Sequence, residues 1–114
     1  MKKLKVITAI GTRPELIRLS RVIDLLDKNL NHVLVHTGQN YDYELNQIFF
    51  KDMSLRKPDF QIKIKNNTPI GAISQILPEV DKIIIKEKPD AFLILGDTNS
   101  SLSAYCAKRM KVPI

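Results

Sequence analysis

The feature of this sequence that most constrains its fold is a regular alternation between short apolar runs and longer amphipathic stretches. The short runs are rich in β-branched residues, which favour strands, and the longer stretches carry apolar residues at helical spacing. We predict strands over Leu4–Ile10, His32–His36, Phe60–Ile64 and Ala91–Leu95, with Val112–Ile114 beginning another. We predict helices over Glu15–Leu30, Tyr43–Met53, Thr68–Glu87 and Asn99–Met110. This order predicts an α/β fold, in which helices cover both faces of a parallel sheet.

One residue conflicts with this pattern. Pro78 lies inside the third predicted helix. A proline in a helix interior removes the hydrogen bond to the residue four positions earlier and crowds that carbonyl group. We therefore expect this helix to be kinked or split near Pro78.

The composition narrows the class of protein. The 114 residues are enough for one small domain, and no apolar run approaches the roughly 18 residues that a membrane span requires. The basic start is followed by only a short apolar stretch, Val6–Ile10, which we interpret as the first strand and not as a signal peptide. Together with the lone Cys106, this indicates the cytoplasm. The net charge of +6 comes from lysines spread along the chain without interleaved aromatics, so nucleic acid is not the expected partner.

Ligands of doubly wound sheets bind beyond the carboxyl ends of the strands, and the first loop in that position reads "GTRPE". Gly11 allows a tight turn, Thr12 and Glu15 have the spacing of a capping box, and Pro14 suits a first helical turn. Arg13 then lies at a helix N-terminus, where the helix dipole favours an anion. The spacing alone equally allows a solvated arginine in an ordinary capped turn.

Two further loops follow apolar strands. "HTGQN" offers the neutral donors and acceptors of Gln39 and Asn40, although an ordinary polar turn has the same composition. In "GDTNSS", Thr98 can cap the next helix, and Asp97 is either a turn residue, a general acid or base, or the partner of Arg13. If the first and fourth strands are neighbours, Arg13 and Asp97 meet in one crevice.

Several chemistries have no signal in this sequence. The glycine patterns of dinucleotide-binding and P-loop proteins are absent, as are Ser-His-Asp and Cys-His arrangements. His32 and His36 share one face of a strand, but no cysteine or carboxylate spacing accompanies them, so we predict no metal. Without a cofactor motif, an arginine-bearing turn suggests a phosphorylated or nucleotide-linked substrate.

Three segments together resemble a known family: "GTRPE", "HTGQNYDYELNQIFF" and "KPDAFLILGDTNSSLSAYCAKRMKVPI". They are similar to the non-hydrolysing UDP-N-acetylglucosamine 2-epimerases, nearest in wording to the branch that forms UDP-N-acetyl-L-fucosamine. The resemblance covers essentially all 114 residues. It implies two Rossmann-like domains facing each other in the GT-B arrangement. Residues 1–114 would be part of the N-terminal domain, and the UDP-binding C-terminal domain would be absent from this chain.

The resemblance also implies an activity. UDP is eliminated from a UDP-linked N-acetylhexosamine to give a 2-acetamidoglycal, and it is added back after C2 is reprotonated from the other face. This route needs no nicotinamide cofactor, because a good leaving group replaces oxidation of a neighbouring carbon. The product would supply cell-surface polysaccharide synthesis. We expect the full-length enzyme to be a homodimer and the isolated 114-residue chain to be inactive.

The resemblance places Arg13 and Asp97 at catalytic positions. It implies substrate contacts for the remaining matched positions, namely Gly11, Thr12, Arg18, Gln39, Asn40 and Thr98. Arg18 stands where many members have lysine, which keeps the charge but changes a point donor into a fork. Asn40 stands where many relatives have a histidine, in a loop that takes part in their allosteric UDP-N-acetylglucosamine site.

Two other functions fit the sequence. A GT-B glycosyltransferase domain has the same architecture but would transfer the sugar to an acceptor. A basic, non-catalytic binding module is the third reading.

Overall fold

The computed structural model describes residues 3–38, 57–65, 68–96 and 98–114, apart from the side chain of Arg13. Four of the described elements are strands: β1 (Lys5–Ile10), β2 (Asn31–His36), β3 (Phe60–Gln61) and β4 (Ala91–Leu93). The others are helices: α1 (Arg13–Asn29), α3 (Pro69–Glu87), the 3-10 helix η1 (Asn99–Ser103) and α4 (Ala104–Arg109). The helix predicted over Tyr43–Met53 lies outside the described residues.

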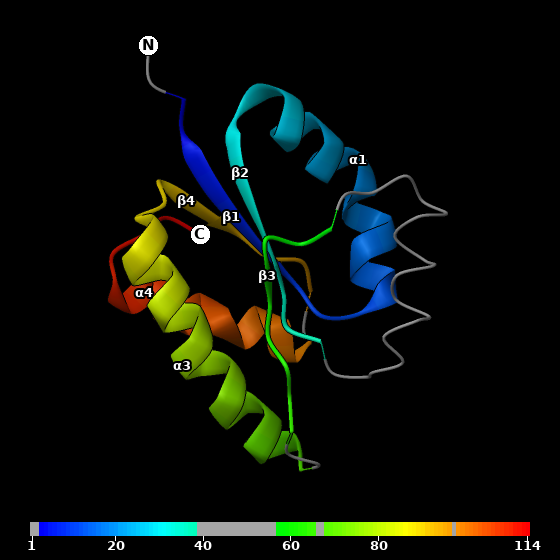
Figure 1. Cartoon of the computed structure of the whole chain (residues 1–114), viewed down its shortest axis with the longest axis vertical. Coiled ribbons are helices and arrows are strands. Elements are labelled where there is room, and N and C mark those ends of the chain that lie inside the picture. The colour runs from blue at the N-terminus through cyan, green and yellow to red at the C-terminus, as the bar shows by residue number, and fades with distance from the viewer. Residues whose placement is uncertain (1–2, 39–56, 66–67, 97) are drawn as a thin grey trace.

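The strands form one parallel sheet in the order β3-β2-β1-β4 (Figure 1). β1 lies between β2 and β4, with Ile10 opposite His36 and Thr8 opposite Leu93. The first and fourth predicted strands are therefore neighbours, as the sequence interpretation required. Their carboxyl ends lie at the same edge of the sheet, together with the carboxyl end of β2.

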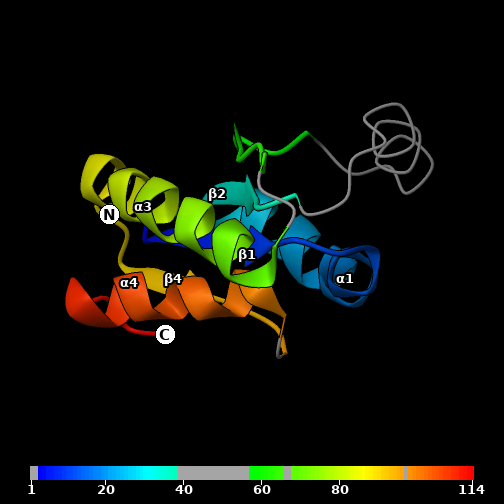
Figure 2. The ribbon, with the colours of Figure 1, turned by 90° about the horizontal axis from the view of Figure 1, so that it is seen from below.

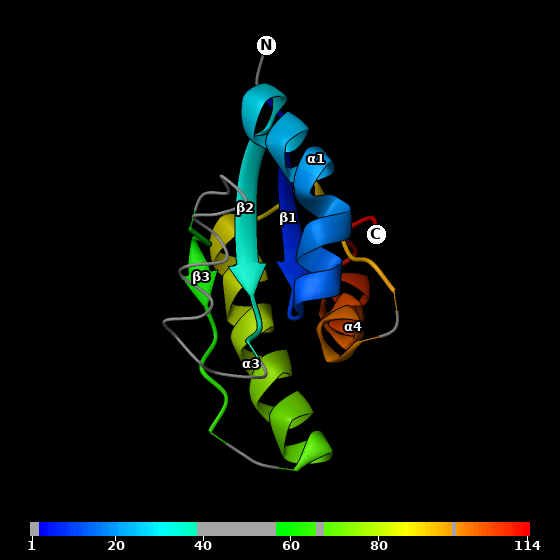
Figure 3. The same ribbon diagram turned by 90° about the vertical axis from the view of Figure 1, so that its right-hand side faces the viewer.

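Helices cover both faces of this sheet, which confirms the predicted architecture. Helix α1 lies in front of β1 and β2 in Figure 3, with α3 behind them. Seen from below, α3 and α4 lie on the opposite side of the strands from α1 (Figure 2). Each face has its own buried cluster. The α1 side holds Ile10, Leu16, Leu19, Ile23 and Leu34, and the larger α3 side is centred on Ile7, Val35, Ile76, Val80 and Phe92.

Three predicted elements differ from the structure in type or by more than two residues, while the strand predicted over Ala91–Leu95 ends at Leu93. The strand expected over Phe60–Ile64 ends at Gln61, although the Ile62 N–H still donates to the His36 carbonyl at 2.9 Å. The helix expected over Asn99–Met110 begins as a 3-10 helix and becomes α-helical only at Ala104. Here the Ser103 hydroxyl donates to the Ser100 carbonyl, a local bond that competes with regular α-helix formation. Residues 112–114 are not a strand, but the Pro113 carbonyl accepts from Phe92 N–H at 2.8 Å.

Pro78 does not split α3, which runs without interruption from Pro69 to Glu87. Pro78 itself is exposed, while Ile76 before it and Val80 after it are buried in the core. Packing on both sides of the proline therefore holds the two halves in one helix, despite the lost hydrogen bond.

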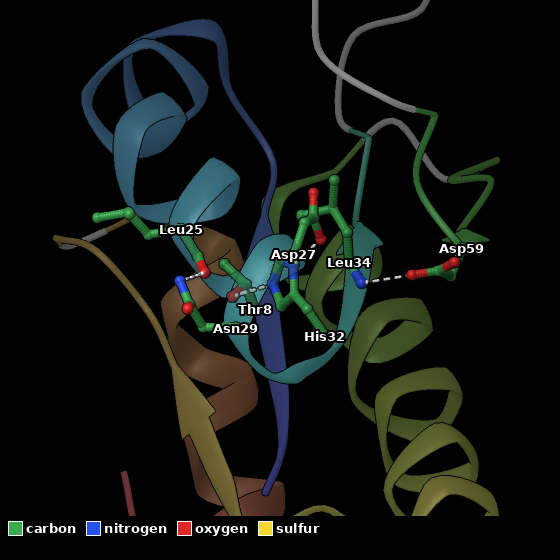
Figure 4. Close-up of polar contacts among 7 residues, drawn as sticks. All are labelled: Thr8, Leu25, Asp27, Asn29, His32, Leu34 and Asp59. Atoms are coloured by element: carbon green, nitrogen blue, oxygen red, sulfur yellow. Dashed lines mark hydrogen bonds and ion pairs between the residues drawn. The ribbon is translucent and has the colours of Figure 1, made fainter. Parts of the chain in front are cut away.

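A buried polar chain ties α1 to the sheet (Figure 4). His32 Nε2 lies 2.7 Å from Thr8 Oγ1, and His32 Nδ1 lies 2.7 Å from Asp27 Oδ1 near the end of α1. The His32 side chain is fully buried. These bonds account for His32 without a metal, and no group of three metal-ligating side chains occurs among residues that the structure describes.

We expect His32→Leu to lower the free energy of unfolding by about 2 kcal/mol. The buried Thr8 hydroxyl and the Asp27 carboxylate would each lose their bond to the imidazole, and buried polar groups left unpaired are costly. Urea denaturation would measure this loss. The matched control is Asp24→Asn, because Asp24 belongs to an exposed ion pair with Lys28 on the same helix. Equal stabilities for the two variants would contradict a structural role for His32.

Candidate functional site

The turn after β1 positions the start of α1. Thr12 is the N-cap residue, and its hydroxyl accepts from Glu15 N–H at 3.4 Å. The Glu15 carboxylate accepts in return from Thr12 N–H at 3.3 Å, which completes the predicted capping box. The helix begins at Arg13, two residues earlier than the sequence pattern indicated. Its N-terminus lies at the carboxyl edge of the sheet, where the helix dipole favours an anion.

At position 11 there is no room for a side chain, and this is why a glycine is required there. Its φ does not lie in the left-handed region, so the backbone conformation of the turn does not itself require a glycine. A Cβ atom at this position would lie 2.6 Å from Thr37 Oγ1 and 3.4 Å from Ser100 Cβ. Gly11 therefore lets the loops that follow β1, β2 and β4 approach one another at a single point.

His36 organises the loop that follows β2. Its Nδ1 accepts from Gly38 N–H at 3.0 Å and from the Gln61 side-chain amide at 3.1 Å. Since both partners donate, the proton of the neutral ring is on Nε2. Burial lowers the pKa of His36 from 6.5 to about 4, so the imidazole is neutral at physiological pH.

Thr37 presents a polar group that the described part of the chain leaves unsatisfied. Its side chain is fully buried, and its hydroxyl has no hydrogen-bond partner among the described residues. Its backbone is held by a bond from Thr37 N–H to the Ile10 carbonyl at 2.7 Å. Buried polar groups are nearly always hydrogen-bonded, so an unsatisfied one beside a helix N-terminus marks a position of functional interest.

The loop that follows β4 reaches the same point. The Ser100 hydroxyl lies 2.9 Å from Oε1 and 3.0 Å from Oε2 of Glu15. Thr98 Oγ1 also donates to Glu15 Oε1 and lies 2.7 Å from the Ser100 hydroxyl. One carboxylate thus joins the turn after β1 to the loop after β4.

The structure brings together Gly11, Thr12 and Thr98 from the predicted site. Arg13 is the first residue of α1, and Arg18 is an exposed residue in the second turn of that helix. Gln39, Asn40 and Asp97 lie outside the described residues.

Sequence reasoning missed four parts of the site. They are the second role of Glu15 and the contributions of His36, Thr37 and Ser100. The loop "GDTNSS" drew attention only to its aspartate and capping residues. The available signal was its run of hydroxyl side chains directly after a buried strand.

These features define a class of protein. The parallel sheet, its strand order and the loops gathered at its carboxyl edge are those of a Rossmann-like α/β domain that binds ligands at this edge. No helix in the described ranges combines the length and the apolar character that crossing a membrane would need.

The chain belongs to the UDP-N-acetylglucosamine 2-epimerase family, whose model matches residues 25–114. It is 39% identical, over 97% of its length, to the UDP-2,3-diacetamido-2,3-dideoxy-D-glucuronate 2-epimerase of Pseudomonas aeruginosa, and covers 32% of that protein. It is 35% identical to the UDP-N-acetylglucosamine 2-epimerase of Methanocaldococcus jannaschii, over 97% of this chain and 31% of the relative.

Solved structures of this family have the same fold as the chain. The UDP-N-acetylglucosamine 2-epimerase of Rickettsia bellii superimposes with a TM-score of 0.87 at 57% identity, over 98% of this chain and 30% of that one. The M. jannaschii enzyme in complex with UDP-GlcNAc and UDP also gives a TM-score of 0.87, at 36% identity over 96% of this chain and 31% of that chain. The chain therefore spans about a third of the length of its relatives, and it forms part of a domain of this GT-B-type fold.

Proposed function

We propose that this chain is the part of a UDP-N-acetylhexosamine 2-epimerase that receives the leaving UDP. The observation that carries the proposal is the N-terminus of α1, which begins with Arg13 at the carboxyl edge of the sheet. The buried, unsatisfied hydroxyl of Thr37 lies beside Gly11 at the same edge. Both features suit a ligand that carries negative charge.

The proposed reaction follows from the substrate's chemistry. A base removes the C2 proton, the C1–O bond breaks, and its electron pair leaves with UDP. Negative charge grows on the departing phosphate, where the Arg13 cation and the helix dipole stabilise it. Protonation of the resulting 2-acetamidoglycal on the opposite face of C2 and re-addition of UDP at C1 complete the inversion. Asp97, directly after the β4 loop glycine, is our candidate for proton transfer.

The substrate proposed within this class is a UDP-linked 2-acetamido-2,6-dideoxy sugar, as in enzymes that form UDP-N-acetyl-L-fucosamine. The argument for this substrate is the similarity of the three loop segments to the sequences of that branch of the family. The P. aeruginosa relative is named for a different UDP-linked acetamido sugar, so the family does not fix this choice. The product would serve cell-surface polysaccharide synthesis.

The test is a chimera in which residues 1–114 replace the corresponding segment of the R. bellii enzyme, to which they are 57% identical. The chimera is incubated in D2O with the UDP-linked 2-acetamido-2,6-dideoxy sugar proposed above. We expect it to place deuterium at C2 and to release some glycal. The 114-residue chain alone should give no turnover, because it spans about a third of its relatives. Transfer of the sugar to an acceptor, without exchange at C2, would instead support a glycosyltransferase.

In this chimera we expect Arg13→Ala to lower kcat by roughly 10²–10³-fold, as loss of a charge-stabilising donor does elsewhere. Arg21→Ala is the matched control, because Arg21 is an exposed arginine on the same helix. A chimera that epimerises equally well with either substitution would contradict the role of Arg13.

A further inference from the structure

We propose that Glu15 is a positioning residue, which fixes the turn bearing Arg13 against the loop bearing Asp97. A helix cap needs only the bonds inside its own turn, and Glu15 has more. Its Oε2 accepts from Gly11 N–H at 2.6 Å and from Thr12 N–H at 3.3 Å. Its two oxygens also accept from Thr98 and Ser100, which lie more than 80 residues further along the chain.

The burial of Glu15 favours a positioning role over direct contact with a ligand. The residue is only 4% exposed, and its carboxylate is surrounded by donors from both loops. The two groups that the proposed reaction needs are close neighbours in sequence of these donors. Arg13 follows Thr12, and Asp97 precedes Thr98. Moving the carboxylate would therefore move one catalytic group relative to the other. The consequence for catalysis rests on the proposed function, but the coupling between the loops does not.

The donors on the two sides of the carboxylate differ in kind, and this difference gives the test. Backbone N–H groups can only donate, so an oxygen must face Gly11 and Thr12. The hydroxyls of Thr98 and Ser100 can rotate to accept. Glutamine can satisfy both sides, with its oxygen towards the turn and its NH2 towards the hydroxyls. Aspartate keeps the charge but is one methylene too short to span the two loops.

Positioning therefore predicts that Glu15→Gln is better tolerated than Glu15→Asp. An acid–base role predicts the reverse order, because only aspartate retains a titrating carboxyl. In the 15N-labelled 114-residue chain, we expect Glu15→Asp to speed hydrogen exchange of the Gly11 amide about tenfold. It should also shift the Ser100 amide resonance. Glu15→Gln should stay within about threefold of the parent in exchange. Glu79→Gln on the exposed face of α3 is the matched control.

Affinity provides the second readout. In the chimera, we expect the dissociation constant for UDP-GlcNAc to rise about tenfold in Glu15→Asp and less than about threefold in Glu15→Gln. If Glu15→Asp fails to fold, Ser100→Ala is the second variant, because it removes the two bonds from Ser100 to Glu15 and leaves the bond from Thr98 and the capping box intact. It should weaken binding while Glu15 N–H stays protected from exchange.

Three outcomes would overturn the proposal. In the first, Glu15→Asp perturbs exchange and affinity less than Glu15→Gln does. In the second, the amide changes in Glu15→Asp are confined to the turn after β1. In the third, Ser100→Ala leaves the affinity for UDP-GlcNAc unchanged in a chimera whose parent binds it. If the parent chimera does not bind UDP-GlcNAc, the proposed function fails, and the exchange and resonance measurements on the 114-residue chain still decide whether Glu15 couples the loops.

Discussion

The folded chain should lose about 3 kcal/mol of stability as the pH falls from 6.5 to about 4, because of His36 alone. Burial lowers the pKa of this residue from 6.5 to about 4. Between these values the unfolded chain binds a proton at His36 and the folded chain does not, so stability decreases as the pH falls. The size follows from a pKa difference of about 2.5 units at 1.36 kcal/mol per unit.

The structural reason is burial, which disfavours the charged imidazolium, and the bonds that Nδ1 accepts add to the loss. A proton there would remove the bonds from Gly38 N–H and from the Gln61 amide, and it would place a buried charge at the end of β2. Urea denaturation at intervals between pH 7 and 4 would measure the loss. His36→Asn is the control, because its side-chain oxygen replaces Nδ1 as an acceptor but does not titrate. A pH slope in His36→Asn as steep as that of the parent would contradict the assignment.

Gly11→Ala should lower the free energy of unfolding by about 2 kcal/mol, which is in the middle of the range for inserting a methyl group into a packed position. The new Cβ would lie 2.6 Å from Thr37 Oγ1, so one of the two loops must move. Because these loops carry the site, UDP-sugar binding in the chimera should fall with stability.

A double-mutant cycle would establish the cause. Thr37→Ala removes the atom in conflict, so Gly11→Ala should cost at least about 1 kcal/mol less in that background. Thr37→Val keeps a methyl group in the same place and should give no relief. Gly96→Ala is a further control. At Gly96, φ is +82° and no atom lies within 4 Å of an added Cβ. The stability that Gly96→Ala loses therefore comes from backbone conformation and not from a steric clash. Equal effects of Gly11→Ala in all three backgrounds would contradict a steric origin.

Local patterns predicted much of the fold, because the interactions that produce them are local. The capping box of Thr12 and Glu15 depends on residues three positions apart, and it occurs as predicted. The alternation of apolar runs and helical stripes also gave the parallel sheet with helices on both faces.

The parts of the site that the sequence did not reveal depend on contacts between distant segments. The bonds from Ser100 to Glu15 join residues 85 positions apart, and nothing near either residue signals the other. The close approach of Gly11 to Thr37 depends on the register of β1 and β2. The split allowed for at Pro78 was wrong for a similar reason, because core packing outweighs one lost helical bond.

The position of β1 at the centre of the sheet has a consequence for biosynthesis. Residues 5–36 form a complete β1-α1-β2 unit with short-range contacts, whereas β4 pairs with β1 across about 85 residues. At roughly 5–20 residues per second, a ribosome needs several seconds to extend the chain from His36 to Ser100. During that interval one edge of β1 has no partner, and Glu15 lacks its donors from the β4 loop. The described part of the site is therefore completed only after the β4 loop has been synthesised, and a chaperone that covers the open edge of β1 would act in this interval.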